Sequence, residues 1–271
     1  MRRRDLLRGA AVAAAGVAVG RFSVDEPPVV LHPGARERGF AGRRSVFLDS
    51  LPKRTNVVWR VQTERPLIAL TFDDGPVPAY TQDYLDMLRE QDVRATFNLV
   101  GRSAVRHPDL VRRELADRHQ VENHSWSHRD LSTASPTEAI AEVQRGTDAL
   151  ESLTGRVPRY FRPPLGNVSG ATLAAVASAQ QDVLLWSVQL REAALDVDAN
   201  VAHVLARVEP GSILLAHDAS HHTIDRRVGL RALPIIIQRL RDRGFEFVTV
   251  DELVGAGTPI GPPDDVATKS D

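Results

Sequence analysis

Short apolar runs alternate along the chain with longer segments in which apolar residues recur at helical spacing. Runs of this length, rich in Val, Ile, Leu and Phe and bounded by turn residues, predict β-strands. The predicted strands cover residues 57–61, 67–72, 95–100, 182–188, 212–217 and 245–250.

The clearest predicted helix begins after Ser135. The residues Ser-Pro-Thr-Glu at 135–138 have the order of a capping box, with proline in the first turn. The positions that follow form one helical stripe in which threonine is the polar member. This stripe consists of Ile140, Val143, Thr147, Leu150 and Leu153. Further helices are predicted at 80–90, 103–118, 170–180, 198–208 and 228–243.

Strands that alternate with helices of this length predict a mainly parallel sheet with helices outside it, an α/β fold. About 200 residues of such units fit one barrel-like domain better than two domains. We place this domain at residues 57–254. Residues 21–56 have no clear period and are interpreted as a linker, and 255–271 as a flexible tail. In this architecture the chemistry lies at the C-terminal ends of the strands.

The N-terminus indicates export. Several arginines precede an uncharged apolar stretch that is too short to span a bilayer comfortably. Arg3-Arg4 followed by Leu6-Leu7 resembles a twin-arginine signal, which carries folded proteins across a membrane. We therefore exclude residues 1–20 from the fold and expect an exported or cell-envelope protein with no membrane span beyond the signal.

Composition narrows the function further. The chain has 271 residues, of which 42% are hydrophobic, and a formal net charge of -1. This balance gives no electrostatic footprint for nucleic acid. The absence of cysteine excludes disulfides, thiolate metal ligands and a cysteine nucleophile. Any metal must therefore be bound by histidines and carboxylates.

Two pairs of residues together predict a metal site. Asp73 and Asp74 end the apolar run 67–72, and successive strand residues point to opposite faces, so one can bind a metal while the other faces a water. His124 and His128 are four residues apart, a spacing that brings two imidazoles to one side of a helical turn. Alone, each pair is more typical of a turn or of surface histidines. Together, Asp74 and the two histidines form a metal-binding set with positions left for water and substrate.

Two further residues stand near predicted strand ends. Arg162 lies before a rigid Pro-Pro turn and could hold a carboxylate ionised and oriented. His217 ends the apolar run 212–217 and could donate a proton to a leaving group. Taken singly, each residue is more typical of an ordinary role, as a surface arginine or as a strand-end histidine that a backbone carbonyl satisfies.

The order of five motifs resembles the polysaccharide deacetylases of the NodB-homology type, carbohydrate esterase family four. The motifs are TFDDGP, NHSWSH, RPPLG, LLWSV and LLAHD, and the similarity covers about residues 57–254. The resemblance implies a distorted (β/α) barrel and hydrolysis of acetyl groups from glycans such as peptidoglycan, chitin-like oligomers or acetylxylan. It also implies a divalent metal, zinc or alternatively cobalt.

The resemblance also implies roles for individual residues. Asp73 would be the general base, His217 the general acid, and Asp74, His124 and His128 the metal ligands.

Three more roles follow from the resemblance. Arg162 would orient the general base, the backbone N–H of Leu165 would stabilise the oxyanion together with the metal, and Trp186 would line the acetyl pocket.

The chain departs from the family pattern at several positions. Leu165 stands where the family usually has tyrosine, and Glu122 where glycine is common. Where the family continues with Asp-x-x-Asp-Trp, the chain has Gln189, Glu192 and Ala193. Because the second Asp of that pattern tunes the acid histidine, tuning of the histidine here depends on whether Glu192 reaches it.

Two alternatives stay open. The chain could be a carbohydrate-binding protein of the same fold that has lost turnover, or an amide or imide hydrolase that uses the same metal site. The histidines at 107, 119, 221 and 222 are interpreted as surface or structural residues and left out of the site.

Overall fold

The computed structural model describes residues 55–220 and 224–261. The predicted export signal at 1–20 and almost all of the predicted linker at 21–56 lie outside these residues. Within the part of the chain that is described, no helix is both long enough and apolar enough to cross a membrane.

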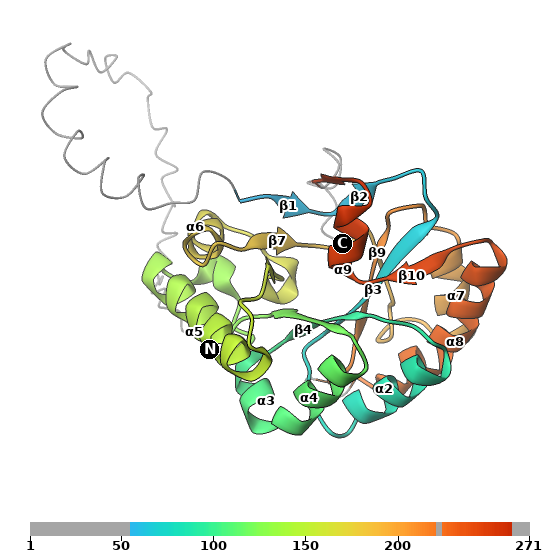
Figure 1. The fold of residues 1–271 in the computed structure, drawn as a ribbon, viewed down its shortest axis with the longest axis horizontal. Helices are drawn as coiled ribbons and strands as arrows, with labels where there is room; N and C mark the ends of the chain where they lie inside the picture. The colour runs from blue at the N-terminus through green and yellow to red at the C-terminus, as the bar shows by residue number, and fades with distance from the viewer. Residues whose placement is uncertain (1–54, 221–223, 262–271) are drawn as a thin grey trace, which may run out of the picture. The chain divides into compact units, whose positions relative to one another are not determined.

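The strands of the main sheet lie at the centre of the domain (Figure 1). Their bounds are β1 Val57–Val58, β3 Leu67–Asp73, β4 Thr96–Leu99, β5 Gln120–Asn123, β6 Tyr160–Phe161, β7 Asp182–Leu184, β8 Val188–Gln189, β9 Ile213–His217 and β10 Glu246–Val248. Neighbouring strands follow the order β1-β7-β6-β5-β4-β3-β9-β8, β10 pairs with the first half of β3, and all these pairs are parallel. A smaller antiparallel sheet joins β2 (Arg60–Gln62) to β11 (Thr258–Ile260).

Helices cover the outside of the main sheet, as predicted for an α/β fold (Figure 1). Their bounds are α2 Thr81–Glu90, α3 Gly101–Arg106, α4 Pro108–Ala116, α5 Pro136–Thr154, α6 Gly170–Ser178, α7 Val197–Leu205, α8 Arg227–Asp242 and α9 Val250–Gly255. Two short 3₁₀ turns cover Leu131–Thr133 and Pro164–Gly166. The described domain therefore confirms the predicted distorted (β/α) barrel.

Strand β3 is the centre of the core, and it sets the position of the site. All seven of its residues are buried, which explains its unbroken apolar sequence. The stacked ring of Phe72 lies 5.0 Å from that of Phe97 on β4. At its C-terminal end the parallel register places Asp73 beside Asn98 of β4 and beside His217 of β9. Three polar side chains thus meet at the end of a buried, apolar layer.

Several predicted elements need correction. The predicted helix 103–118 is two helices, because Pro108 begins α4 and cannot continue the hydrogen-bond ladder of α3. Helix α5 has the predicted capping box at Ser135, but Ile140 is 36% exposed and Ala139 takes the buried position. Strand β11 lies in the predicted tail at 255–271, where pairing with β2 orders it.

The predicted strand 182–188 is in fact two strands. The chain passes between them from one end of the sheet to the other. The first strand, β7, pairs with β1 and β6, whereas β8 pairs with β9 at the other end of the strand order. The described strands β1 and β8 do not pair with each other. Residues 185–187 therefore cross the seam of the barrel, and Trp186 lies in this crossing.

Candidate active site

The first half of the site surrounds Asp73. Its Oδ1 accepts hydrogen bonds from Asn98 Nδ2 at 2.7 Å and from Arg162 Nη1 at 2.8 Å. The side chain of Asp73 is 5% exposed and that of Arg162 is fully buried. A buried carboxylate that receives two such bonds is held in one orientation, which leaves Oδ2 free of these two donors.

Arg162 is fixed by the barrel seam. Its Nη1 also donates to Thr71 Oγ1 at 2.7 Å, while Nε donates to the carbonyl of Leu184 at 3.2 Å and Nη2 to that of Leu185 at 3.0 Å. These two carbonyls belong to the last residue of β7 and to the residue that follows it. Arg162, the predicted partner of Asp73, therefore also donates to the backbone carbonyls at the end of β7.

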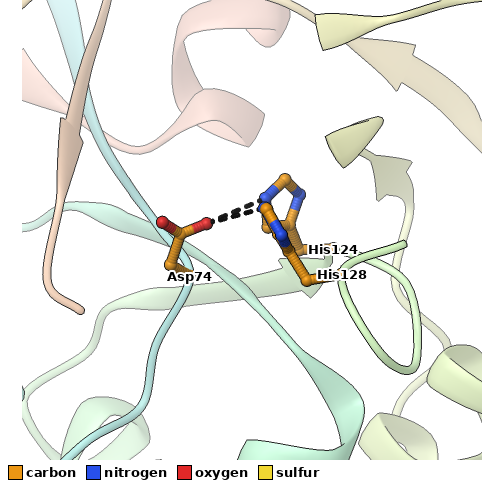
Figure 2. A group of neighbouring side chains, drawn as sticks. All are labelled: Asp74, His124 and His128. Carbon is orange, nitrogen blue, oxygen red and sulfur yellow. Dashed lines mark ion pairs between the residues drawn. The ribbon is translucent and has the colours of Figure 1, made fainter. Parts of the chain in front are cut away.

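Asp74, His124 and His128 form the second feature of the site (Figure 2). Asp74 Oδ1 lies 3.0 Å from His128 Nε2 and 3.4 Å from His124 Nε2. One donor atom from each residue lies within 4.8 Å of the other two. Two imidazole nitrogens and one carboxylate oxygen at this separation fit a divalent metal with coordination positions left for water or substrate.

The histidines reach this arrangement in a way that differs from the prediction. Residues 124–128 do not form a helical turn but a loop after β5, in which Ser125 and His128 have φ values of 66° and 60°. Glu142 of α5 accepts hydrogen bonds from the backbone N–H of Ser127 at 2.9 Å and from its hydroxyl. Asn123 Oδ1 accepts from the backbone N–H of Ser125. The loop is therefore held by hydrogen bonds to its neighbours rather than by a helix.

Electrostatics at the set favour a cation. Burial alone would raise the pKa of Asp74, but the hydrogen bonds from His124 and His128 outweigh burial and lower this pKa well below its usual range. Burial disfavours the charged form of His124, yet the charges of Asp73 and Asp74 raise its pKa. The Nδ1 atom of His124 lies 2.7 Å from the carbonyl of Arg162, a bond that orients Nε2 toward Asp74.

His217 lines a cavity of about 290 Å³ whose wall also includes Asp73, Asp74 and both histidines of the set. Its Nδ1 is 3.3 Å from Oε2 of Glu192, and that same oxygen accepts from Arg226 Nη1 at 3.0 Å. Glu192 therefore reaches His217, which is the contact that the departure from the family pattern had left open.

Leu165 and Trp186 both line the same cavity. Leu165 has a φ of 62° and is 65% exposed, so its side chain stands at the rim. A Cβ atom on Gly166 would lie 2.7 Å from the Trp186 ring, which shows how closely this turn packs on the indole. The indole Nε1 donates to Gln189 Oε1 at 2.9 Å.

The turn that carries the two aspartates packs on Asp218. A Cβ atom on Gly75 would collide with Oδ2 of Asp218, so only glycine fits there. Thr81 donates to the same oxygen at 2.5 Å. Burial raises the pKa of Asp218 to about 7. Sequence reasoning did not assign a role to Asp218, although it follows His217 directly in the fifth motif.

Two other members of the site were missed. Asn98 could have been noticed as a single amide inside an apolar strand. Arg226 has no local signal, because its partner Glu192 is 34 residues away in the chain. Among the histidines left out, His119 is buried and its Nδ1 accepts from the backbone N–H of Ala95, as expected for a structural residue. Residues 221 and 222 lie outside the described residues.

Comparisons with known proteins identify the family of the chain. The family profile described as polysaccharide deacetylase matches residues 60–184. A peptidoglycan-N-acetylglucosamine deacetylase of Bacillus cereus is 34% identical over 201 residues, which are 73% of this chain and 92% of the relative. A chitooligosaccharide deacetylase of a Bradyrhizobium species is 38% identical over 196 residues, 69% of this chain and 90% of the relative.

Solved structures include both an enzyme and a pseudoenzyme. The crystal structure of a peptidoglycan N-acetylglucosamine deacetylase superposes with a TM-score of 0.69 at 28% identity, over 74% of this chain and 94% of the other. A mutant of a carbohydrate esterase family four pseudoenzyme with restored activity has a TM-score of 0.68 at 25% identity, over 74% and 72% of the two chains. Turnover must therefore be argued from the residues of the site.

Proposed function

Because this chain belongs to the polysaccharide deacetylase family, we propose that it is a metal-dependent hydrolase that removes acetyl groups from a bacterial cell-wall or chitin-like glycan. The observation that carries the proposal is the meeting of Asp73 with the metal-binding set and His217 around one cavity. Asp73 is buried against Arg162, and His217 is supported by Glu192.

Asp73 is the proposed general base. Its Oδ1 is occupied by Asn98 and Arg162, so Oδ2 is the oxygen that takes the proton from the attacking water. This Oδ2 lies 3.9 Å from Nε2 of His124, beside the metal-binding set. Bound at Asp74, His124 and His128, a divalent cation such as zinc or cobalt supplies a Lewis acid for the acetyl carbonyl and lowers the pKa of a water.

The remaining residues bind and release the products. We assign the backbone N–H of Leu165 to the carbonyl oxygen, where negative charge develops as the water oxygen adds to the carbon. His217 donates a proton from Nε2 to the leaving nitrogen when the C–N bond breaks. The products are acetate and a free amino sugar, or a free hydroxyl when the substrate is an ester.

The cavity and the relatives support the proposed substrate class. A cavity of about 290 Å³ is near the lower end of ligand sites, so it suits one acetylated sugar unit while the rest of a glycan lies along the rim. Relatives named for peptidoglycan and chitooligosaccharides support an N-acetylated glycan. Trp186 beside Leu165 and Gly166 is the proposed wall for the acetyl methyl group.

The place of action is also a proposal. Relatives named for peptidoglycan support a protein that works outside the cytoplasm or in the cell envelope. The arginine-rich, apolar pattern of residues 1–20 supports export, and the twin-arginine route is the form of export that we propose.

Acetate release from N-acetylated peptidoglycan, chitooligosaccharides and acetylxylan, with and without chelator, tests the function. We expect release from at least one N-acetylated glycan, loss of release with chelator, and recovery with zinc or cobalt. Activity on a cyclic imide alone would favour an imide hydrolase. Metal and glycan binding without acetate release would identify a binding protein.

A further inference from the structure

Arg226 is a buried residue of the site that the proposed reaction leaves without a role. It directly precedes α8, lines the cavity and is 7% exposed. Its Nε donates to the carbonyl of Ala219 at 3.0 Å, and its own carbonyl accepts from the hydroxyl of Tyr84 at 2.7 Å. The guanidinium is therefore held from both ends of the residue, as expected for a group whose orientation matters.

The two ends of the guanidinium face the two halves of the site. Nη1 donates to Oε2 of Glu192 at 3.0 Å, and Nη2 lies 3.8 Å from Oδ2 of Asp74. Asp74 belongs to the metal-binding set and Glu192 supports His217. The side chain of Arg226 thus contacts both Asp74 of the metal-binding set and Glu192, the partner of His217.

Glu192 depends on this contact. Its side chain is 1% exposed, and a buried carboxylate is costly unless it is paired with a cation and hydrogen-bonded. Its Oε1 has no hydrogen-bond partner among the described residues, so Oε2 carries the bonds to both Arg226 and His217. Because a carboxylate only accepts, the hydrogen of His217 that faces it is on Nδ1, which leaves Nε2 for the cavity.

We propose that Arg226 is a positioning residue that keeps the Glu192 carboxylate aimed at His217, and so selects the orientation of the imidazole that serves as acid. This inference rests on the proposed deacetylase function. Because the arginine acts through Glu192, its loss should matter most where the leaving group needs a proton. Amides need that proton more than esters with a good leaving group do.

Arg226→Met tests the inference, with Arg227→Met as the matched control. Arg227 is the next residue, and its side chain is 59% exposed. We expect Arg226→Met to keep its metal and to lower kcat about 10- to 100-fold on an N-acetylated glycan, with KM nearly unchanged. On an activated acetate ester the loss should be less than about threefold. Arg227→Met should match the wild-type protein on both substrates.

Two further variants keep the test decisive. Arg226→Lys retains a cation that can reach Glu192 and should recover part of the amide activity. Glu192→Gln should give the same amide-selective loss, and the double variant should be little worse than either single one. If Arg226→Met does not fold, the amide-to-ester ratio of Arg226→Lys and Glu192→Gln decides.

Equal losses on amide and ester would overturn the inference, as would independent, additive effects of the Arg226 and Glu192 substitutions. Metal content by mass spectrometry and thermal melting on each preparation separate positioning from a loss of ligands or of fold. A wild-type protein without activity on any acetylated substrate would instead contradict the proposed function itself.

Discussion

Each half of the site pairs a buried arginine with a carboxylate. In one half this carboxylate is itself the proposed reacting group, whereas in the other it contacts the proposed reacting group. On the side of the proposed base, Arg162 bonds directly to the carboxylate of Asp73, and both side chains are buried. On the side of the proposed acid, Arg226 bonds to Glu192, and Glu192 in turn contacts His217.

The difference follows from what each reacting group must do. A base must be anionic before the reaction, so a cation beside it stabilises the required state directly. A cation in direct contact with an acid opposes its cationic form, and here the carboxylate of Glu192 lies between Arg226 and His217. Substitutions should therefore affect the two halves differently.

The largest difference is expected at the adjacent aspartates. Asp73→Asn should keep the metal and slow both amide and ester hydrolysis by about 10²- to 10⁴-fold, because every substrate needs the attacking water to lose a proton. Asp74→Ala, its matched control, should lose metal and activity together, because a ligand is removed. Metal content and acetate release on the same preparations check this. Equal metal loss in both variants would show that the pair acts jointly.

A more selective loss is expected at His217. His217→Ala should retain its metal and slow amide hydrolysis by about 10²-fold or more, because the departing amine then lacks its proton donor. An activated ester should slow by less than about tenfold, since its leaving group departs without a proton. The measurement is the ratio of the two rates for variant and wild type. An unchanged ratio would remove His217 from the role of acid.

The smallest effect is expected in the loop that carries the metal-binding histidines. Glu142→Ala removes the acceptor for the backbone and hydroxyl of Ser127 and should weaken metal binding by about 10- to 100-fold. At saturating metal the ratio of amide to ester hydrolysis rates should stay at the wild-type value, because the substitution changes neither Asp73 nor His217 nor their partners. Titration calorimetry measures the affinity, and Glu151→Ala on the exposed face of the same helix is the control. An unchanged affinity for the metal would mean that the loop keeps its conformation without the hydrogen bonds to Glu142.

The central strands and the residues at their ends could be predicted because the signal is local. An unbroken apolar run indicates a doubly buried strand, and parallel register then brings the C-terminal ends together, as it does for Asp73 and His217. Capping chemistry likewise located the start of α5, because Ser135 and Glu138 are three residues apart.

The rest depends on contacts between distant parts of the chain. Strand β5, with the sequence QVEN, has no apolar run, and its polar residues can be buried because they find hydrogen-bond partners, as Glu122 does in the backbone N–H of Tyr160. The two-residue strands and the crossing at 185–187 follow from barrel closure, which local periodicity does not report. Arg226 was missed for the same reason, since its role exists only once Glu192 and Asp74 are brought together.

The shortness of the terminal strands of the sheet also bears on how the protein behaves at high concentration. β1 and β8 contain two residues each, so an added strand from another molecule could form only one or two ladder bonds at either end. Long, flat edges are the usual templates for intermolecular β-pairing, and very short edge strands are one of the ways in which natural proteins avoid it. Although its core is a parallel sheet of apolar strands, the folded domain presents little edge on which aggregates could grow.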